Sequence, residues 1–111
     1  MSRADLARAD ALHCERIVRS HARTFALASY FLPPMKRRAA FALYAFCRVA
    51  DDLVDAADDT SPASVARELA RYRCDLGRAA SGAADGPVFR ELAWVLDAYG
   101  VPVRVLEELG L

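Results

Sequence analysis

The sequence predicts an all-α protein, and three observations support this prediction. Apolar residues recur at three- and four-residue intervals in every long segment, which is the period of a helix with one buried face. Prolines and capping residues stand where such helices would begin. No segment shows the apolar–polar alternation of a strand. We therefore expect four helices and a short stub within one domain, residues 1–111.

The first helix is expected to begin near Arg3, because Ser2 and Asp5 match a capping box with Asp in place of Glu. A polar interruption at residues 20–24 predicts a kink or a break. The proline pair at residues 33–34 ends this element, since the residue before a proline disfavours helix.

The central helix is predicted from the run at residues 39–57, and Pro34 can occupy the first turn of this helix. The run contains neither Gly nor Pro and is apolar on most of its circumference, which is typical of a helix buried in a larger core. We expect it to be the most buried helix and to end by residues 58–60. The basic residues 36–38 are interpreted as a solvated turn.

Three further elements follow. Ser61 and Pro62 predict a helix start as N-cap and first helical residue. Residues 81–86 form a turn, after which a helix starts at Pro87 and stops at Gly100. Pro102 opens a last helix at residues 103–109.

One face of the central helix carries a polar stripe. Tyr44, Arg48, Asp51 and Asp55 fall within about 60° of one another on a helical wheel, and Asp52 lies beside them. Carboxylates four residues apart repel unless a cation lies between them, and Arg48 can offset only one. Mg²⁺ held by carboxylate and phosphate oxygens would supply the remaining positive charge. The stripe therefore predicts a diphosphate–metal site facing a cavity, with a solvated acidic face as the alternative.

Two segments resemble the squalene/phytoene synthase family. The pattern PPxKRRA followed by LYAFCRVxDDxVD, ending at Asp55, is similar to the family's first aspartate-rich motif. His21-x-x-Thr24-Phe25 stands where the family has His-Ser-x-Ser-Phe. Ala22 departs from that segment by lacking a hydroxyl, whereas Thr24 keeps one. Without the resemblance, a lone His beside an apolar run is more typical of a core residue.

The resemblance implies the N-terminal helices of an isoprenoid synthase fold. It also implies Mg²⁺-dependent head-to-head condensation of two prenyl diphosphates, farnesyl or geranylgeranyl, in isoprenoid or carotenoid biosynthesis. NADPH would be needed only for a squalene product. The resemblance assigns catalysis to Tyr44, Arg48, Asp51 and Asp55; substrate binding to His21, Thr24, Phe25, Tyr44 and Arg48; and metal binding to Asp51, Asp55 and Asp52.

The family carries a second aspartate-rich motif that these 111 residues lack. We therefore expect a truncated fragment that is inactive without a C-terminal half, so whether this chain alone is an enzyme stays open. The alternative is a non-catalytic helical interaction module, for which the acidic stripe is only surface. A ferritin-like metal protein is excluded, because the sequence has no Glu-x-x-His pair.

Composition and charge exclude other classes. With 15 basic and 15 acidic residues, the chain lacks the basic excess of a nucleic-acid binder. Cys14, Cys47 and Cys74 form no C-x-x-C pair and are expected to be reduced thiols. The longest apolar run, residues 39–47, is too short to cross a bilayer. We expect a cytoplasmic protein, and the family's lipid products leave peripheral contact with a membrane open.

Overall fold

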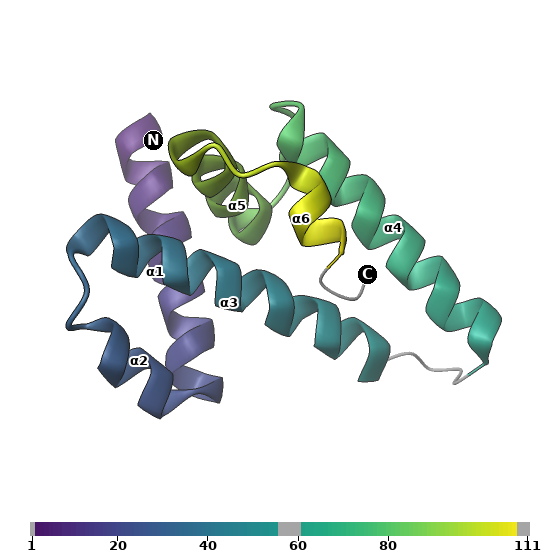
Figure 1. Ribbon diagram of the computed structural model, residues 1–111, viewed down its shortest axis with the longest axis horizontal. Helices are drawn as coiled ribbons and strands as arrows, with labels where there is room; N and C mark the ends of the chain where they lie inside the picture. The colour runs from purple at the N-terminus through teal and green to yellow at the C-terminus, as the bar shows by residue number, and fades with distance from the viewer. Residues whose placement is uncertain (1, 56–60, 109–111) are drawn as a thin grey trace.

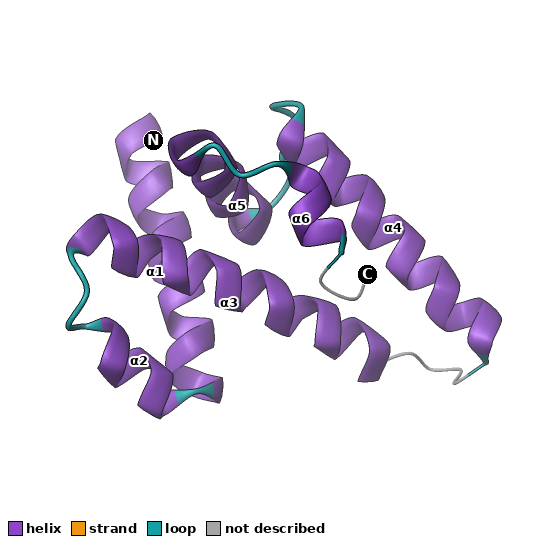
Figure 2. Ribbon diagram, viewed as in Figure 1, coloured by secondary structure: helices purple, strands orange, loops and turns teal. Residues whose placement is uncertain are grey.

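The computed structural model describes residues 2–55 and 61–108, apart from the side chains of residues 54 and 55. Within this part the chain forms helices and no strand, which confirms the all-α prediction (Figures 1 and 2). The helices are α1 (Arg3–His21), α2 (Arg23–Ser29), α3 (Pro34–Asp55), α4 (Pro62–Ala80), α5 (Pro87–Tyr99) and α6 (Val103–Glu107).

Local signals set the helix ends at the N-terminal side of the chain. The backbone N–H of Asp5 donates to the Ser2 hydroxyl at 3.1 Å, and the Ser2 N–H donates to the Asp5 carboxylate at 3.4 Å, which confirms the capping box. The predicted interruption is a break: Ala22, at φ −148° and ψ 69°, separates α1 from α2. The break lets α2 turn away from α1 and lie against α3 (Figure 1).

The later helix ends also follow the sequence. Ser61 caps α4 by accepting a hydrogen bond from the Ser64 N–H at 3.2 Å, and Pro62 follows at the first position. Gly100 ends α5 in the left-handed region at φ 62°, which a residue with a Cβ adopts only with strain. The described part of the last helix is a single short turn, α6; residues 109–111 lie outside the description.

The core lies where α1, α3, α4 and α5 meet. Its centre is an aromatic cluster in which the Phe46 ring stacks on Tyr72 at 5.2 Å and the Phe89 ring meets both edge-on. The buried Tyr72 hydroxyl donates to the Phe46 backbone carbonyl at 2.6 Å, which ties α4 to α3. Burial raises the pKa of the Tyr72 hydroxyl, so it remains a donor throughout the physiological range.

The expectation that the central helix is the most buried is wrong. Among the described residues, α5 buries six side chains in 13 residues, as many as α3 buries in 22. The physical reason is that α3 packs mainly through its apolar side, and α2 covers only the first turn of its polar stripe. Its buried residues pack against α1, α4 and α5, whereas Asp51 and Asp52 near its C-terminal end are exposed in the described part. Neither α3 nor any other described helix is long and apolar enough to cross a bilayer.

The interpretation of residues 36–38 as a solvated turn is also wrong for Arg38. Its guanidinium donates two hydrogen bonds to the Glu91 carboxylate, at 2.8 and 2.7 Å, and lies 3.8 Å from the centre of the Trp94 ring. Glu91 is fully buried, so it needs a cationic partner to remain ionised. Hydrogen bonding to Glu91 raises the pKa of Arg38. This pair fixes the first turn of α3 to α5.

A second pair of the same kind fixes α5 to α1. Arg90 donates to both oxygens of the buried Asp10, at 2.7 and 2.9 Å. Cys14 lies one turn along α1, and burial together with the nearby Glu91 and Asp10 charges raises the pKa of its thiol to about 12. The two bidentate pairs together hold the three-helix arrangement of α1, α3 and α5.

Candidate active site on helix α3

The α3 stripe, which is Tyr44, Arg48, Asp51 and Asp55, lies on one helical face because α3 runs unbroken to Asp55. Tyr44 and Arg48 are half-buried, and Asp51 is exposed. The side chain of Asp55 lies outside the described residues, so its predicted role stays a prediction. The structure therefore places the described part of the stripe on one continuous surface.

Arg48 is held by the carboxylate four residues further along. Its Nε lies 3.2 Å from Oδ1 of Asp52, although this contact is not aligned as a hydrogen bond. The terminal nitrogens of Arg48 make no hydrogen bond within the described residues, so they can donate to phosphate oxygens. Asp52 was predicted as a metal ligand; in the structure it is the ion-pair partner that orients Arg48, and metal binding by it stays a prediction.

Helix α2 covers the first turn of the stripe. The Phe25 ring stacks on Tyr44 with centroids 5.4 Å apart and planes inclined by 28°. Two residues assigned to substrate binding, 19 positions apart in the sequence, thus meet in space. The contact exists because the break at Ala22 turns α2 across α3.

His21 and Thr24 flank this contact without joining it. His21 is the last residue of α1 and Thr24 lies in the first turn of α2, and both are exposed. No hydrogen bond or ion pair links either residue to the α3 stripe in the part of the chain described. Their predicted substrate-binding roles remain predictions.

The stripe was expected to face a cavity, and in the structure Asp51 and Asp52 are exposed instead. Apart from α2, which covers the first turn of the stripe, the described helices pack on the apolar face of α3, and this leaves the acidic end open. Among the described side chains, no group of three His, Cys, Asp or Glu converges as a metal site. Carboxylates on successive turns are nonetheless the ligands that Mg²⁺ prefers, so the Mg²⁺ site remains a prediction.

Comparison with known proteins identifies the fold. A family model described as squalene/phytoene synthase matches residues 18–110. The chain belongs to the squalene/phytoene synthase family. That match includes the break at Ala22, the Phe25–Tyr44 contact and the whole α3 stripe.

Individual members of the squalene/phytoene synthase family give the same result. The phytoene synthase of Cereibacter sphaeroides is 35% identical over 94% of this chain and 31% of its own length. The phytoene synthase of Thermus thermophilus is 32% identical over 78% of this chain and 28% of its own. The crystal structure of squalene synthase HpnC from Alicyclobacillus acidocaldarius superposes with a TM-score of 0.75 at 34% identity, covering 93% of this chain and 37% of that one.

Most of this chain is covered in these three comparisons, but it spans only about a third of the length of each relative. The helical arrangement of α1 to α6 is therefore the squalene synthase fold over that portion. The resemblance drawn from the two sequence segments is confirmed.

Proposed function

We propose that this chain supplies the diphosphate-binding surface of an enzyme that condenses two prenyl diphosphates head to head. The observation that carries the proposal is the α3 stripe: an arginine, ion-paired with Asp52, one turn before an exposed aspartate, on the helix that the family match covers. Loss of diphosphate leaves an allylic cation, so the reaction needs stabilisation of the negative charge on the leaving group.

The chain's own residues would share that task. Arg48, held by Asp52, would donate to diphosphate oxygens, and the Tyr44 hydroxyl would add a hydrogen bond next to it. The stacked Phe25 and Tyr44 rings would line the route of a prenyl tail at the same place. The diphosphate group and the prenyl tail of the substrate would therefore bind at adjacent turns of α3.

Asp51 and Asp55 are the residues that would hold Mg²⁺ here. Both positions lie on the same face of α3, one turn apart. Bound Mg²⁺ would act as a Lewis acid on the diphosphate and neutralise part of its charge. Asp52 would keep Arg48 oriented during binding.

The test replaces the matching segment of the Cereibacter sphaeroides phytoene synthase with residues 1–111 and measures hydrocarbon product from farnesyl and geranylgeranyl diphosphate, with and without NADPH. Asp51→Asn is expected to lower turnover on the order of hundreds-fold, by analogy with loss of one electrostatic stabiliser. Asp97→Asn, an exposed aspartate on α5, is the matched control and should leave turnover unchanged.

A binding measurement on the 111-residue chain gives an independent result. Calorimetry with inorganic pyrophosphate and Mg²⁺ should show affinity that falls about tenfold in Arg48→Gln, because one charge-assisted hydrogen-bond donor set is lost. Near-normal turnover of the Asp51→Asn chimera, together with unchanged pyrophosphate affinity of Arg48→Gln, would mean that the stripe is only surface. That outcome would favour the non-catalytic interaction module.

A further inference from the structure

The turn between α2 and α3 is closed by a side chain from α3. Arg37, in the first turn of α3, donates from Nη2 to the backbone carbonyls of Tyr30 and Leu32, at 3.3 Å each. Carbonyls at the C-terminal end of a helix have no partner inside that helix, and a cation placed there also interacts favourably with the helix dipole. Arg37 therefore caps the C-terminal end of α2 from the next helix along the chain.

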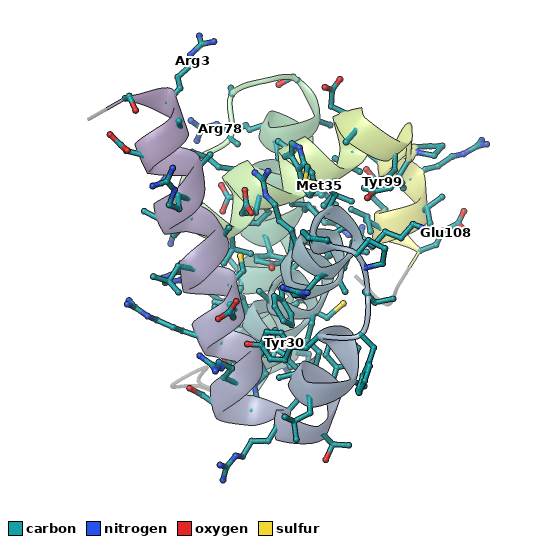
Figure 3. The ribbon with its side chains drawn as sticks, turned by 90° about the vertical axis from the view of Figure 1, so that its left-hand side faces the viewer. Arg3, Tyr30, Met35, Arg78, Tyr99 and Glu108 are labelled. Carbon is teal, nitrogen blue, oxygen red and sulfur yellow. The ribbon has the colours of Figure 1, made fainter. Side chains whose placement is uncertain are left out.

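The Tyr30 side chain joins the same cluster. The Arg37 guanidinium lies over the Tyr30 ring at 5.1 Å from its centre, and that of Arg19, on α1, lies over it at 5.8 Å. The ring also meets Phe41 of α3 edge-on, with centroids 6.0 Å apart. Figure 3 looks onto this edge of the molecule, with Tyr30 labelled beside α1. We call Arg19, Tyr30 and Arg37 the Tyr30 clamp, because through it α1 and α3 both hold the end of α2.

Helix α2 depends on contacts of this kind. It has only seven residues, fewer than a helix needs to be stable alone in water. Ala22 stands at its N-cap and supplies no side-chain hydrogen bond. The first turn of α2 carries Phe25, whose ring stacks on Tyr44 of the α3 stripe. The position of that ring is therefore set by the contacts that hold α2 as a whole.

We infer that Arg37 is a positioning residue for binding of the prenyl diphosphate, because the Tyr30 clamp fixes α2 across α3 and keeps Phe25 stacked on Tyr44. Arg37 and Tyr44 are seven residues apart, so they lie two turns apart on the same face of α3. Arg37 donates to the backbone of the turn, so it acts through α2 and not on the reacting atoms. The inference rests on the proposed function, in which the two rings line the route of the prenyl tail.

Nuclear magnetic resonance on the 111-residue chain tests the positioning without substrate. In the unchanged chain we expect nuclear Overhauser contacts between the ring protons of Phe25 and Tyr44, and between those of Phe46 and Tyr72. Arg37→Met should weaken the first contact, because the cap on α2 is lost, and leave the second unchanged, because that core pair joins α3 to α4. The second contact also shows that the variant is folded.

Two further variants complete this measurement. Tyr30→Leu removes the ring from the clamp and keeps the backbone carbonyls, so it should weaken the Phe25–Tyr44 contact even if Arg37→Met does not fold. Lys36→Met is the matched control, because it removes an exposed cation next to Arg37 in the same turn and should leave both contacts unchanged.

Kinetics in the Cereibacter sphaeroides chimera show whether the positioning serves the reaction. Arg37→Met is expected to raise KM for the prenyl diphosphate by about tenfold and to change kcat by less than about twofold, since a binding wall is lost and no group on the leaving diphosphate is. Arg37→Lys keeps a cation near the Tyr30 ring but not the planar donors of a guanidinium, so its KM should lie between those of Arg37→Met and the unchanged chimera. Lys36→Met should leave both constants unchanged.

The two measurements separate failure of this inference from failure of the proposed function. An unchanged Phe25–Tyr44 contact in folded Arg37→Met, or an equal loss in Lys36→Met, would overturn the inference whatever the chimera does. A lost contact with unchanged KM would also overturn it, because α2 would then be held in place without serving substrate binding. A chimera in which Asp51→Asn has near-normal turnover would refute the proposed function, and the resonance contact would still decide whether Arg37 positions Phe25.

Discussion

Replacing Arg38 should lower the free energy of unfolding more than replacing its partner, Glu91. In Arg38→Met the Glu91 carboxylate, whose side chain is 2% exposed, loses both its hydrogen bonds and its counter-charge. Leaving a buried charge unpaired destabilises by about 3–5 kcal/mol, and the partial exposure of Arg38, 23%, places the expected loss near 3 kcal/mol. For a domain of this size, that corresponds to a fall in Tm of about 13 °C.

The reverse change should have a smaller effect. In Glu91→Met the Arg38 guanidinium keeps its contact with Trp94 and can recruit water, so we expect a loss of about 1–2 kcal/mol. The double variant replaces both charges by apolar side chains of similar length and should be more stable than Arg38→Met. Lys36→Met, at an exposed position in the same turn, is the control and should change the free energy of unfolding by less than about 0.5 kcal/mol.

Urea denaturation followed by circular dichroism at the helical band measures these four free energies of unfolding. Equal losses in Arg38→Met and Glu91→Met would contradict the assignment of the cost to the buried carboxylate. A loss below about 1 kcal/mol in Arg38→Met would show that the pair contributes no more than a surface ion pair.

In native protein, Ellman's reagent should modify the exposed Cys47 and Cys74 and leave the buried Cys14 unmodified until denaturant is added. The pKa of the Cys14 thiol in the folded protein is about 12, above its ordinary value of 9.0. The contribution of this neutral thiol to the free energy of unfolding should therefore be lost as pH rises above 9 toward 12. Tyr72→Phe removes the hydrogen bond to the Phe46 carbonyl and should lower the free energy of unfolding by about 1 kcal/mol in the same urea assay. The purified 111-residue chain with Mg²⁺ and radiolabelled farnesyl or geranylgeranyl diphosphate should form no hydrocarbon. The Mg²⁺ that one pair of carboxylates can hold neutralises only part of the diphosphate charge, and the exposed stripe leaves the allylic cation open to water. Clear turnover would contradict this prediction.

The sequence alone predicted most of the helix ends and the alignment of the α3 stripe. Helix starts at Ser2 and Ser61, the break near Ala22 and the stop at Gly100 all depend on residues within one turn of each other, so local pattern suffices. The alignment of the α3 stripe follows from the helical period in the same way. The Arg48–Asp52 pair was not predicted from the sequence, because Asp52 was assigned to metal binding, although a spacing of four residues is typical of such a pair.

Only the tertiary structure decided which helices meet and which faces stay open. Arg38 and Glu91 are 53 residues apart, and Arg90 and Asp10 are 80 apart. A charged residue inside an apolar helical stripe, as Glu91 is among Val88, Leu92 and Val95, indicates that a partner exists but not which one.

The exposure of Asp51 and the stacking of Phe25 on Tyr44 were settled in the same way, by how α2 and α3 pack. A helical period specifies which side of one helix is apolar. The angle and register at which two such sides fit depend on the shapes of side chains far apart in the chain, and no local pattern contains them.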